Sequence, residues 1–62
     1  MRKIEREAFK NRLYYYIKHF GPYTLMDLVN IFRVHHSTVL GQLQALVKEG
    51  RIAKDNKLYR VE

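Results

Sequence analysis

Residues 23–40 read YTLMDLVNIFRVHHSTVL, a sequence that predicts two helices joined by a tight turn. The first helix begins after Thr24, whose hydroxyl can cap it, and Asp27 three residues later completes a capping-box-like pair. This helix is expected over residues 25–32. The side chains that it turns toward a core are Leu25, Leu28, Val29 and Phe32.

The turn after this helix is about three residues long and reads Arg33-Val34-His35. A third helix is expected from about residue 36 to 49, ending before Gly50, which favours a left-handed cap. Two helices joined by so short a turn form a helix-turn-helix. The inward side chains of the third helix are Val39, Leu43, Leu46 and Val47.

A longer helix precedes this pair, over residues 3–20. It should end at Gly21, because Pro22 cannot continue the ladder of hydrogen bonds. Its apolar residues recur at helical spacing and form one stripe. These residues are Phe9, Leu13, Tyr16, Ile17 and Phe20.

The period changes after the third helix, where residues 51–61 contain two short β-prone runs on either side of Asp55-Asn56. Both of these residues tolerate positive φ, which predicts a hairpin turn. The chain is therefore expected to form one domain over residues 1–62, mainly α with a small β-hairpin.

The composition limits the classes of protein to which this chain can belong. It has 62 residues, a net charge of +6 and 47 % hydrophobic residues, too apolar for a disordered basic tail. It has no cysteine, which excludes disulfides and cysteine-based zinc sites. We find neither a signal peptide nor an apolar run long enough to span a membrane, so a cytoplasmic location is expected.

The order of these features resembles the winged helix-turn-helix domain of small transcriptional regulators such as the MarR and ArsR families. The resemblance covers about residues 14–61, and its most specific parts are residues 23–29 and 32–39. It departs at Arg33, where the family has a turn glycine, and at His35, where the family has a capping serine. A left-handed backbone is therefore expected at Arg33. The resemblance implies sequence-specific binding of double-stranded DNA.

In similar proteins the third helix enters the major groove and the hairpin, or wing, lies on the flanking backbone. With Val39 and Leu43 inward, rotation by 100° per residue turns the following residues outward: Ser37, Thr38, Gly41, Gln44, Ala45 and Lys48. Gln44 can pair with adenine, and Lys48 can neutralise a phosphate. His36 is a further candidate for a phosphate contact.

The hairpin supplies the remaining candidates. Lys54 and Arg60 lie on or near it, and the tip residues Asn56 and Lys57 would reach a minor groove or the backbone. A hairpin whose charges only keep the protein soluble is the alternative. The candidate DNA-binding residues are thus His36, Ser37, Thr38, Gly41, Gln44, Ala45, Lys48, Lys54, Asn56, Lys57 and Arg60.

Two further features of the helices bear on contacts with DNA or protein. Ser37, Gly41 and Ala45 form a ridge of small residues with three interpretations: a helix seated deep in a DNA groove, a contact with a partner protein, which is the alternative function, or tolerated surface without a role. A thinner strip on the first helix, Ile4, Ala8 and Tyr15, predicts a homodimer.

Other kinds of site are not favoured by the sequence. His35 and His36 diverge by about 100° on a helix, so no metal site is expected. We find no phosphate-binding glycine loop and no nucleophile–base pair, so no enzyme and no cofactor are expected. A chain of this length also leaves no room for a domain that binds a small-molecule effector.

Overall fold

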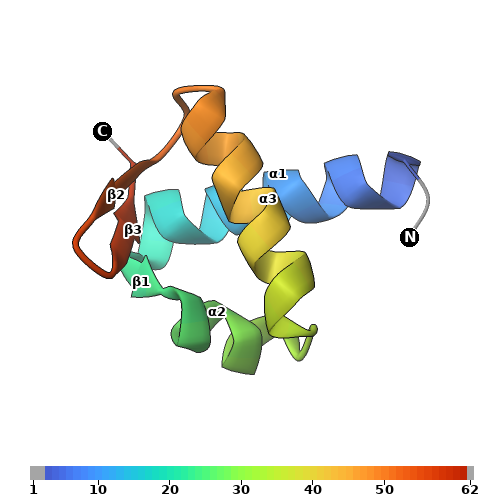
Figure 1. The fold of residues 1–62 in the computed structure, drawn as a ribbon, viewed down its shortest axis with the longest axis horizontal. Coiled ribbons are helices and arrows are strands. Elements are labelled where there is room, and N and C mark those ends of the chain that lie inside the picture. The colour runs from blue at the N-terminus through green and yellow to red at the C-terminus, as the bar shows by residue number, and fades with distance from the viewer. Residues whose placement is uncertain (1–2, 62) are drawn as a thin grey trace.

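The computed structural model describes the backbone of residues 3–61 and the side chains of residues 5–61. Its helices and strands are α1 (Lys3–Phe20), β1 (Tyr23–Thr24), α2 (Leu25–Phe32), α3 (His36–Lys48), β2 (Ala53–Asp55) and β3 (Leu58–Arg60). In Figure 1, α3 crosses in front of α1, and the strands lie to one side of all three helices. The expectation of a mainly helical chain with a small β element is confirmed, and each helix ends within one residue of its predicted bounds.

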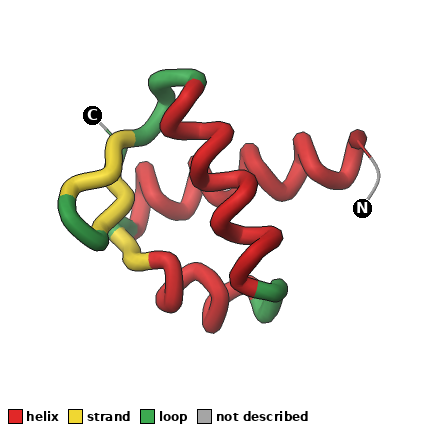
Figure 2. Tube along the Cα trace, viewed as in Figure 1, coloured by secondary structure: helices red, strands yellow, loops and turns green. Residues whose placement is uncertain are grey.

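The strands form a three-stranded antiparallel sheet in the order β1-β3-β2, one strand more than the predicted hairpin. The extra strand, β1, pairs Tyr23 with Tyr59 across the sheet. The hairpin pairs Asp55 with Leu58, so its turn is Asn56-Lys57 and not Asp55-Asn56 as predicted. Asn56 has a φ of 61°, which explains why asparagine suits the turn. Figure 2 shows the three strands gathered at one edge of the molecule.

The connections around α2 follow the predicted chemistry. Thr24 accepts a hydrogen bond from the backbone N–H of Asp27, and the Asp27 carboxylate accepts one from the N–H of Thr24, which completes the capping box. The turn to α3 begins at Arg33, whose φ of 54° and ψ of 42° lie in the left-handed region. A non-glycine residue thus occupies a left-handed backbone position, as expected.

The core lies where the three helices and the hairpin meet. Its buried hydrophobic side chains are Leu13, Ile17, Leu28, Val39, Leu43, Leu46, Ile52 and Tyr59. The prediction that Phe20 and Val47 lie in the core is wrong, because Phe20 is 59 % exposed and Val47 is 38 % exposed. Phe20 is the last residue of α1 and lies against the ring of Tyr16, whereas Val47 faces the space between α3 and the hairpin.

A polar contact joins the end of α3 to the middle of α1. Lys10, only 8 % exposed, donates a hydrogen bond of 2.6 Å to Glu49 and lies 3.4 Å from Glu7. This bond raises the pKa of Lys10 and lowers the pKa of Glu49. Arg51 continues the contact, since its guanidinium donates to the side chains of Asn11 and Glu49. These bonds fix the chain at the start of the hairpin, and with it the position of the hairpin beside α3.

Candidate nucleic-acid interface

The outward side of α3 is largely free of contacts with the rest of the described chain. Ser37, Gly41, Gln44 and Lys48 are exposed, as predicted. A Cβ atom built on Gly41 would meet no heavy atom within 4 Å. This side of α3 is therefore an open surface about three turns long.

Two residues assigned to this side turn partly away from it. Thr38 and Ala45 are only half-exposed. Ala45 lines a hollow beside α1, together with Arg6, Glu7, Lys10 and Gln42. The small-residue ridge is thus fully open at Ser37 and Gly41 but flanked by long α1 side chains at Ala45.

The first turn of α3 is capped by a histidine ring. Nδ1 of His35 accepts a hydrogen bond of 3.2 Å from the backbone N–H of Ser37 and lies 2.8 Å from the Ser37 hydroxyl. His36, the candidate for a phosphate contact, is exposed, and its ring centroid lies 4.5 Å from that of His35. The imidazole of His35 thus caps α3 and also lies within hydrogen-bond distance of the hydroxyl of Ser37, one of the candidate DNA contacts.

The candidate DNA-binding residues of the hairpin lie on two different faces of the sheet. Residues paired across two strands share one face of a sheet, so Lys54 lies on the face of Tyr59 and Arg60 lies on the opposite face. Lys54 Nζ is 5.8 Å from the centroid of the Tyr59 ring, on the side of α3. Arg60 lies 3.7 Å from Asp55 on the other side. Asn56 and Lys57 are exposed at the tip.

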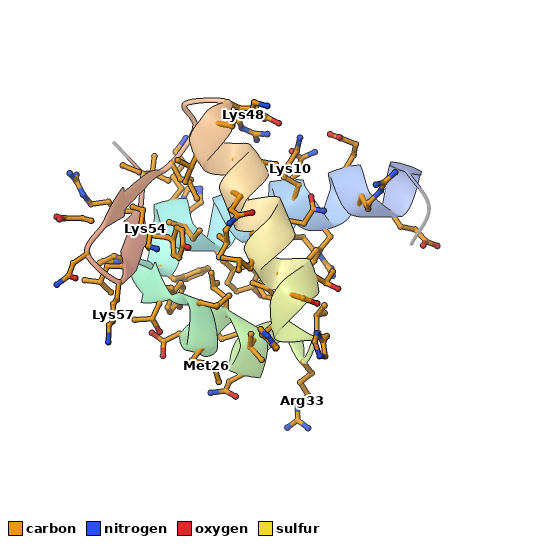
Figure 3. All side chains as sticks on the ribbon, in the orientation of Figure 1. Lys10, Met26, Arg33, Lys48, Lys54 and Lys57 are labelled. Carbon is orange, nitrogen blue, oxygen red and sulfur yellow. The ribbon has the colours of Figure 1, made fainter. Side chains whose placement is uncertain are left out.

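Arg60 therefore does not belong with the lysines that border α3. Arg60, a candidate DNA-binding residue, thus lies on the face of the sheet away from α3, because the alternation of a strand sends adjacent side chains to opposite faces. Figure 3 shows Lys54 and Lys57 on the hairpin and Lys48 at the far end of α3.

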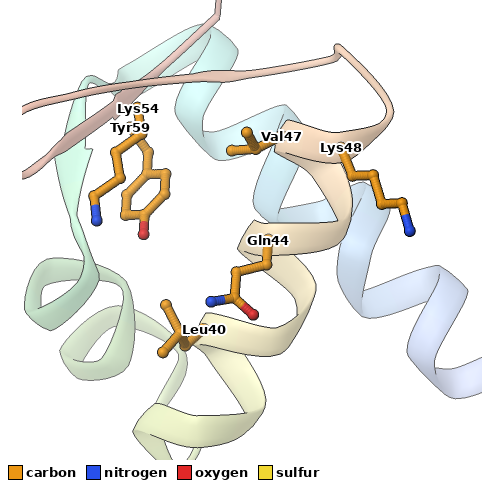
Figure 4. Close-up of a pocket in the computed structure, with 6 residues that line it drawn as sticks. All are labelled: Leu40, Gln44, Val47, Lys48, Lys54 and Tyr59. Carbon is orange, nitrogen blue, oxygen red and sulfur yellow. The ribbon is translucent and has the colours of Figure 1, made fainter.

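A groove runs between α3, the hairpin and the start of α2, and sequence reasoning missed it. It consists of two adjoining hollows of about 260 and 370 Å³ that share Leu40, Lys54 and Tyr59. The other lining residues are Thr24, Leu25, Met26, Gln44, Val47, Lys48 and Lys57. Figure 4 shows Leu40, Gln44 and Val47 directed from α3 toward Lys54 and Tyr59 on the sheet. We call this feature the α3–hairpin groove.

The charge of the α3–hairpin groove is positive. Its lining contains three lysines and no acidic residue. Among the described residues, the ion pairs of basic side chains involve Lys10, Arg51 and Arg60, so Lys48, Lys54 and Lys57 form none. Three cationic side chains on this side of the molecule are thus available to an anionic partner.

The strip that predicted a dimer is described only in part. Ala8 and Tyr15 are exposed on α1, Tyr15 at 53 %, whereas the side chain of Ile4 lies outside the described residues. The Tyr15 ring lies 4.4 Å from His19 and 6.4 Å from Phe20, measured between centroids. The exposed apolar surface of α1 thus extends toward its C-terminal end.

The described residues include no group of three or more histidine, cysteine or acidic side chains placed to hold a metal ion. None of the helices in this part of the chain has the length and apolar character needed to cross a membrane. In comparisons with known proteins, no family model, no curated protein and no solved structure matches the chain.

Proposed function

We propose that this chain is a winged helix-turn-helix protein that binds double-stranded DNA sequence-specifically and acts as a small transcriptional regulator. In this proposal α3 enters the major groove, and the hairpin lies along the flanking backbone. One observation carries it: the exposed side of α3 is bordered by three lysines that form no ion pair with any described residue, one on α3 and two on the hairpin.

The proposed DNA-binding residues have two roles: some bind phosphates and position the protein, and others recognise bases. Lys48, Lys54 and Lys57 are point charges suited to phosphates, which hold the protein on any duplex. Gln44 is the long amide among the exposed residues of α3, and its donor and acceptor match the major-groove edge of adenine. Gly41 adds no side chain beside it, so the helix can approach the bases closely.

A salt titration of binding to random duplex DNA tests the electrostatic part of this proposal. For B-DNA, each phosphate that the protein neutralises contributes about −0.9 to the slope of log K against log salt. Lys54→Ala with Lys57→Ala should therefore flatten the slope by about 1.8 and weaken binding to all sequences about equally. An unchanged slope would place the hairpin away from the DNA.

A matched control removes the same charge from another surface. Arg12 and Lys18 are exposed on α1 and do not line the α3–hairpin groove. Arg12→Ala with Lys18→Ala should leave the salt slope nearly unchanged. If both double variants flatten the slope equally, net charge and not the proposed face governs binding.

The variant Gln44→Ala tests sequence recognition, since it should reduce the preference of the protein for a selected site over random DNA.

A homodimer through α1 is part of the same proposal. A twofold axis at the surface of Ala8 and Tyr15 would cover exposed apolar side chains and pair two copies of α3 with two half-sites.

A further inference from the structure

The α3–hairpin groove presents apolar side chains to solvent. Met26 is 58 % exposed and Val47 is 38 % exposed, and Leu40 lies between them on the groove wall. Tyr59 forms the floor on the side of the sheet. Met26 and Val47 stay exposed in the described part of the chain, so an occupant with apolar groups of its own would be stabilised by removing them from water.

The positive charge of the groove favours an apolar occupant that also carries negative charge. Lys54 and Lys57 line it from the hairpin and Lys48 from α3, and none of the described residues that line it is acidic. A cationic or neutral apolar segment would leave these ammonium groups without partners. An occupant with carboxylates beside its apolar side chains would match both the floor and the lysines.

DNA would match the charge of this surface but not its apolar side chains. Its phosphates match the lysines, but its backbone and base edges are mainly polar and would not cover Met26, Leu40 and Val47 together. A protein segment with large apolar side chains can match both, as amphipathic helices do in apolar grooves elsewhere.

We propose that the α3–hairpin groove binds a short acidic, amphipathic segment of a partner protein. Its apolar side chains lie on Met26, Leu40 and Val47, and its carboxylates face Lys54 and Lys57. The proposal goes beyond DNA binding and does not need it. One consequence rests on the proposed function: because the same lysines would hold phosphates, the segment and the duplex would exclude each other.

The probe is a synthetic peptide of about four helical turns, with leucines on one face and glutamates on the others. Two control peptides separate its features, one with glutamine in place of every glutamate and one of glutamate alone. Binding is followed by the NMR signal of the Met26 methyl group, which lies on the groove, and by titration of the peptide. The acidic amphipathic peptide should shift this signal, and each control peptide should bind at least about tenfold more weakly.

A pair of variants on one helix tests the apolar contact. Met26 and Ile31 are both exposed on α2, but Ile31 does not line the groove. Met26→Ala should weaken peptide binding about tenfold, while Ile31→Ala should change it less than about twofold. Both residues are exposed, so both variants should keep the fold, and circular dichroism checks this.

Three outcomes would overturn the proposal: no shift of the Met26 methyl signal, equal effects of Met26→Ala and Ile31→Ala, or equal binding of the glutamate-only peptide. The last outcome would indicate a general anion surface of the kind DNA uses. Competition with a labelled duplex separates the two proposals. If the protein binds the peptide in the groove but does not bind duplex DNA, the result supports this proposal and contradicts the proposed function. If it binds duplex DNA but not the peptide, the result contradicts this proposal and supports the proposed function.

Discussion

Gly41 offers a direct test of how α3 is placed, because its environment predicts the effect of alanine on stability. It lies in the middle of α3, and an added Cβ would meet no heavy atom within 4 Å. Alanine in an exposed helix interior is favoured over glycine by about 1 kcal/mol, since glycine loses more backbone freedom on folding. Gly41→Ala should therefore raise the free energy of unfolding by nearly this amount. For a domain of this size the melting temperature should rise by about 4–8 °C.

The other two glycines serve as controls with different physical reasons. Gly50 also has open space around its Cβ position, but its φ of +76° is left-handed, so Gly50→Ala should destabilise by about 1 to 2 kcal/mol. At Gly21 the added Cβ would lie 2.5 Å from the carbonyl oxygen of Ile17, and the backbone must shift to relieve this contact. Thermal unfolding of the three alanine variants should thus give one gain and two losses. A loss of stability in Gly41→Ala would refute the view that this side of α3 is open.

The same position distinguishes DNA binding from a protein contact on α3. If α3 enters the major groove, Gly41→Arg should lower duplex affinity and leave the mass of the protein unchanged, because added atoms collide with base edges or the backbone. If Ser37 and Gly41 instead pack against a second copy, Gly41→Arg should dissociate it. Duplex affinity and mass are measured together on the same sample. Tighter binding by a lighter particle would contradict the proposed orientation of α3.

Three further predictions follow from other contacts. Because the bond from Lys10 lowers the folded pKa of Glu49 below its ordinary 4.5, the pair stabilises the fold above that pH, and this stability is lost as pH falls through the lower folded pKa. Glu49→Gln should accordingly flatten the fall of melting temperature in acid, and an unaltered profile would contradict the pairing. Arg33→Gly should stabilise by up to about 1 kcal/mol in urea unfolding, since the left-handed backbone is strained for arginine, and a clear loss would show that the side chain matters more than the strain. Ala8→Glu with Tyr15→Glu should give monomers in sedimentation, and an unmodified chain that is already monomeric at tens of micromolar would remove the dimer.

Features encoded by neighbouring residues could be predicted from the sequence. The capping box of Thr24 and Asp27 spans three residues. The left-handed backbone at Arg33 is expected from the resemblance alone, because the similar family has glycine at this place. The bounds of α1, α2 and α3 follow from apolar spacing and from the breaks after them. The outward residues Gly41 and Gln44 of the candidate interface follow from helical rotation alone. Each of these features depends on residues within one or two turns of chain.

Contacts between distant residues could not be predicted in this way. Strand β1 consists of Tyr23 and Thr24 and exists because β3 lies beside it, so its two residues carry no alternation that could be recognised. Lys10 is 39 residues from Glu49 in the sequence, and counting charges along the chain does not predict that Lys10 is buried. Val47 has the spacing of a core residue, but the hairpin stops short of covering it. The α3–hairpin groove is missed for the same reason, because three separate segments line it.

The charge that lines the α3–hairpin groove sets the salt dependence expected when one copy of this chain binds DNA through this face. Among the described basic residues, Lys10 is buried against Glu49 and Arg60 faces away beside Asp55, whereas Lys48, Lys54 and Lys57 line the groove. If these three lysines each neutralise one phosphate, the salt slope is about −2.7, so affinity should fall about 40-fold when salt rises from about 50 to about 200 mM. So small a neutralised charge favours weak binding by a single copy, and a second copy on the same duplex would double the slope. A measured slope near −5 would therefore support two copies acting together, whereas a slope near −2.7 with tight binding would require that contacts to bases supply most of the affinity.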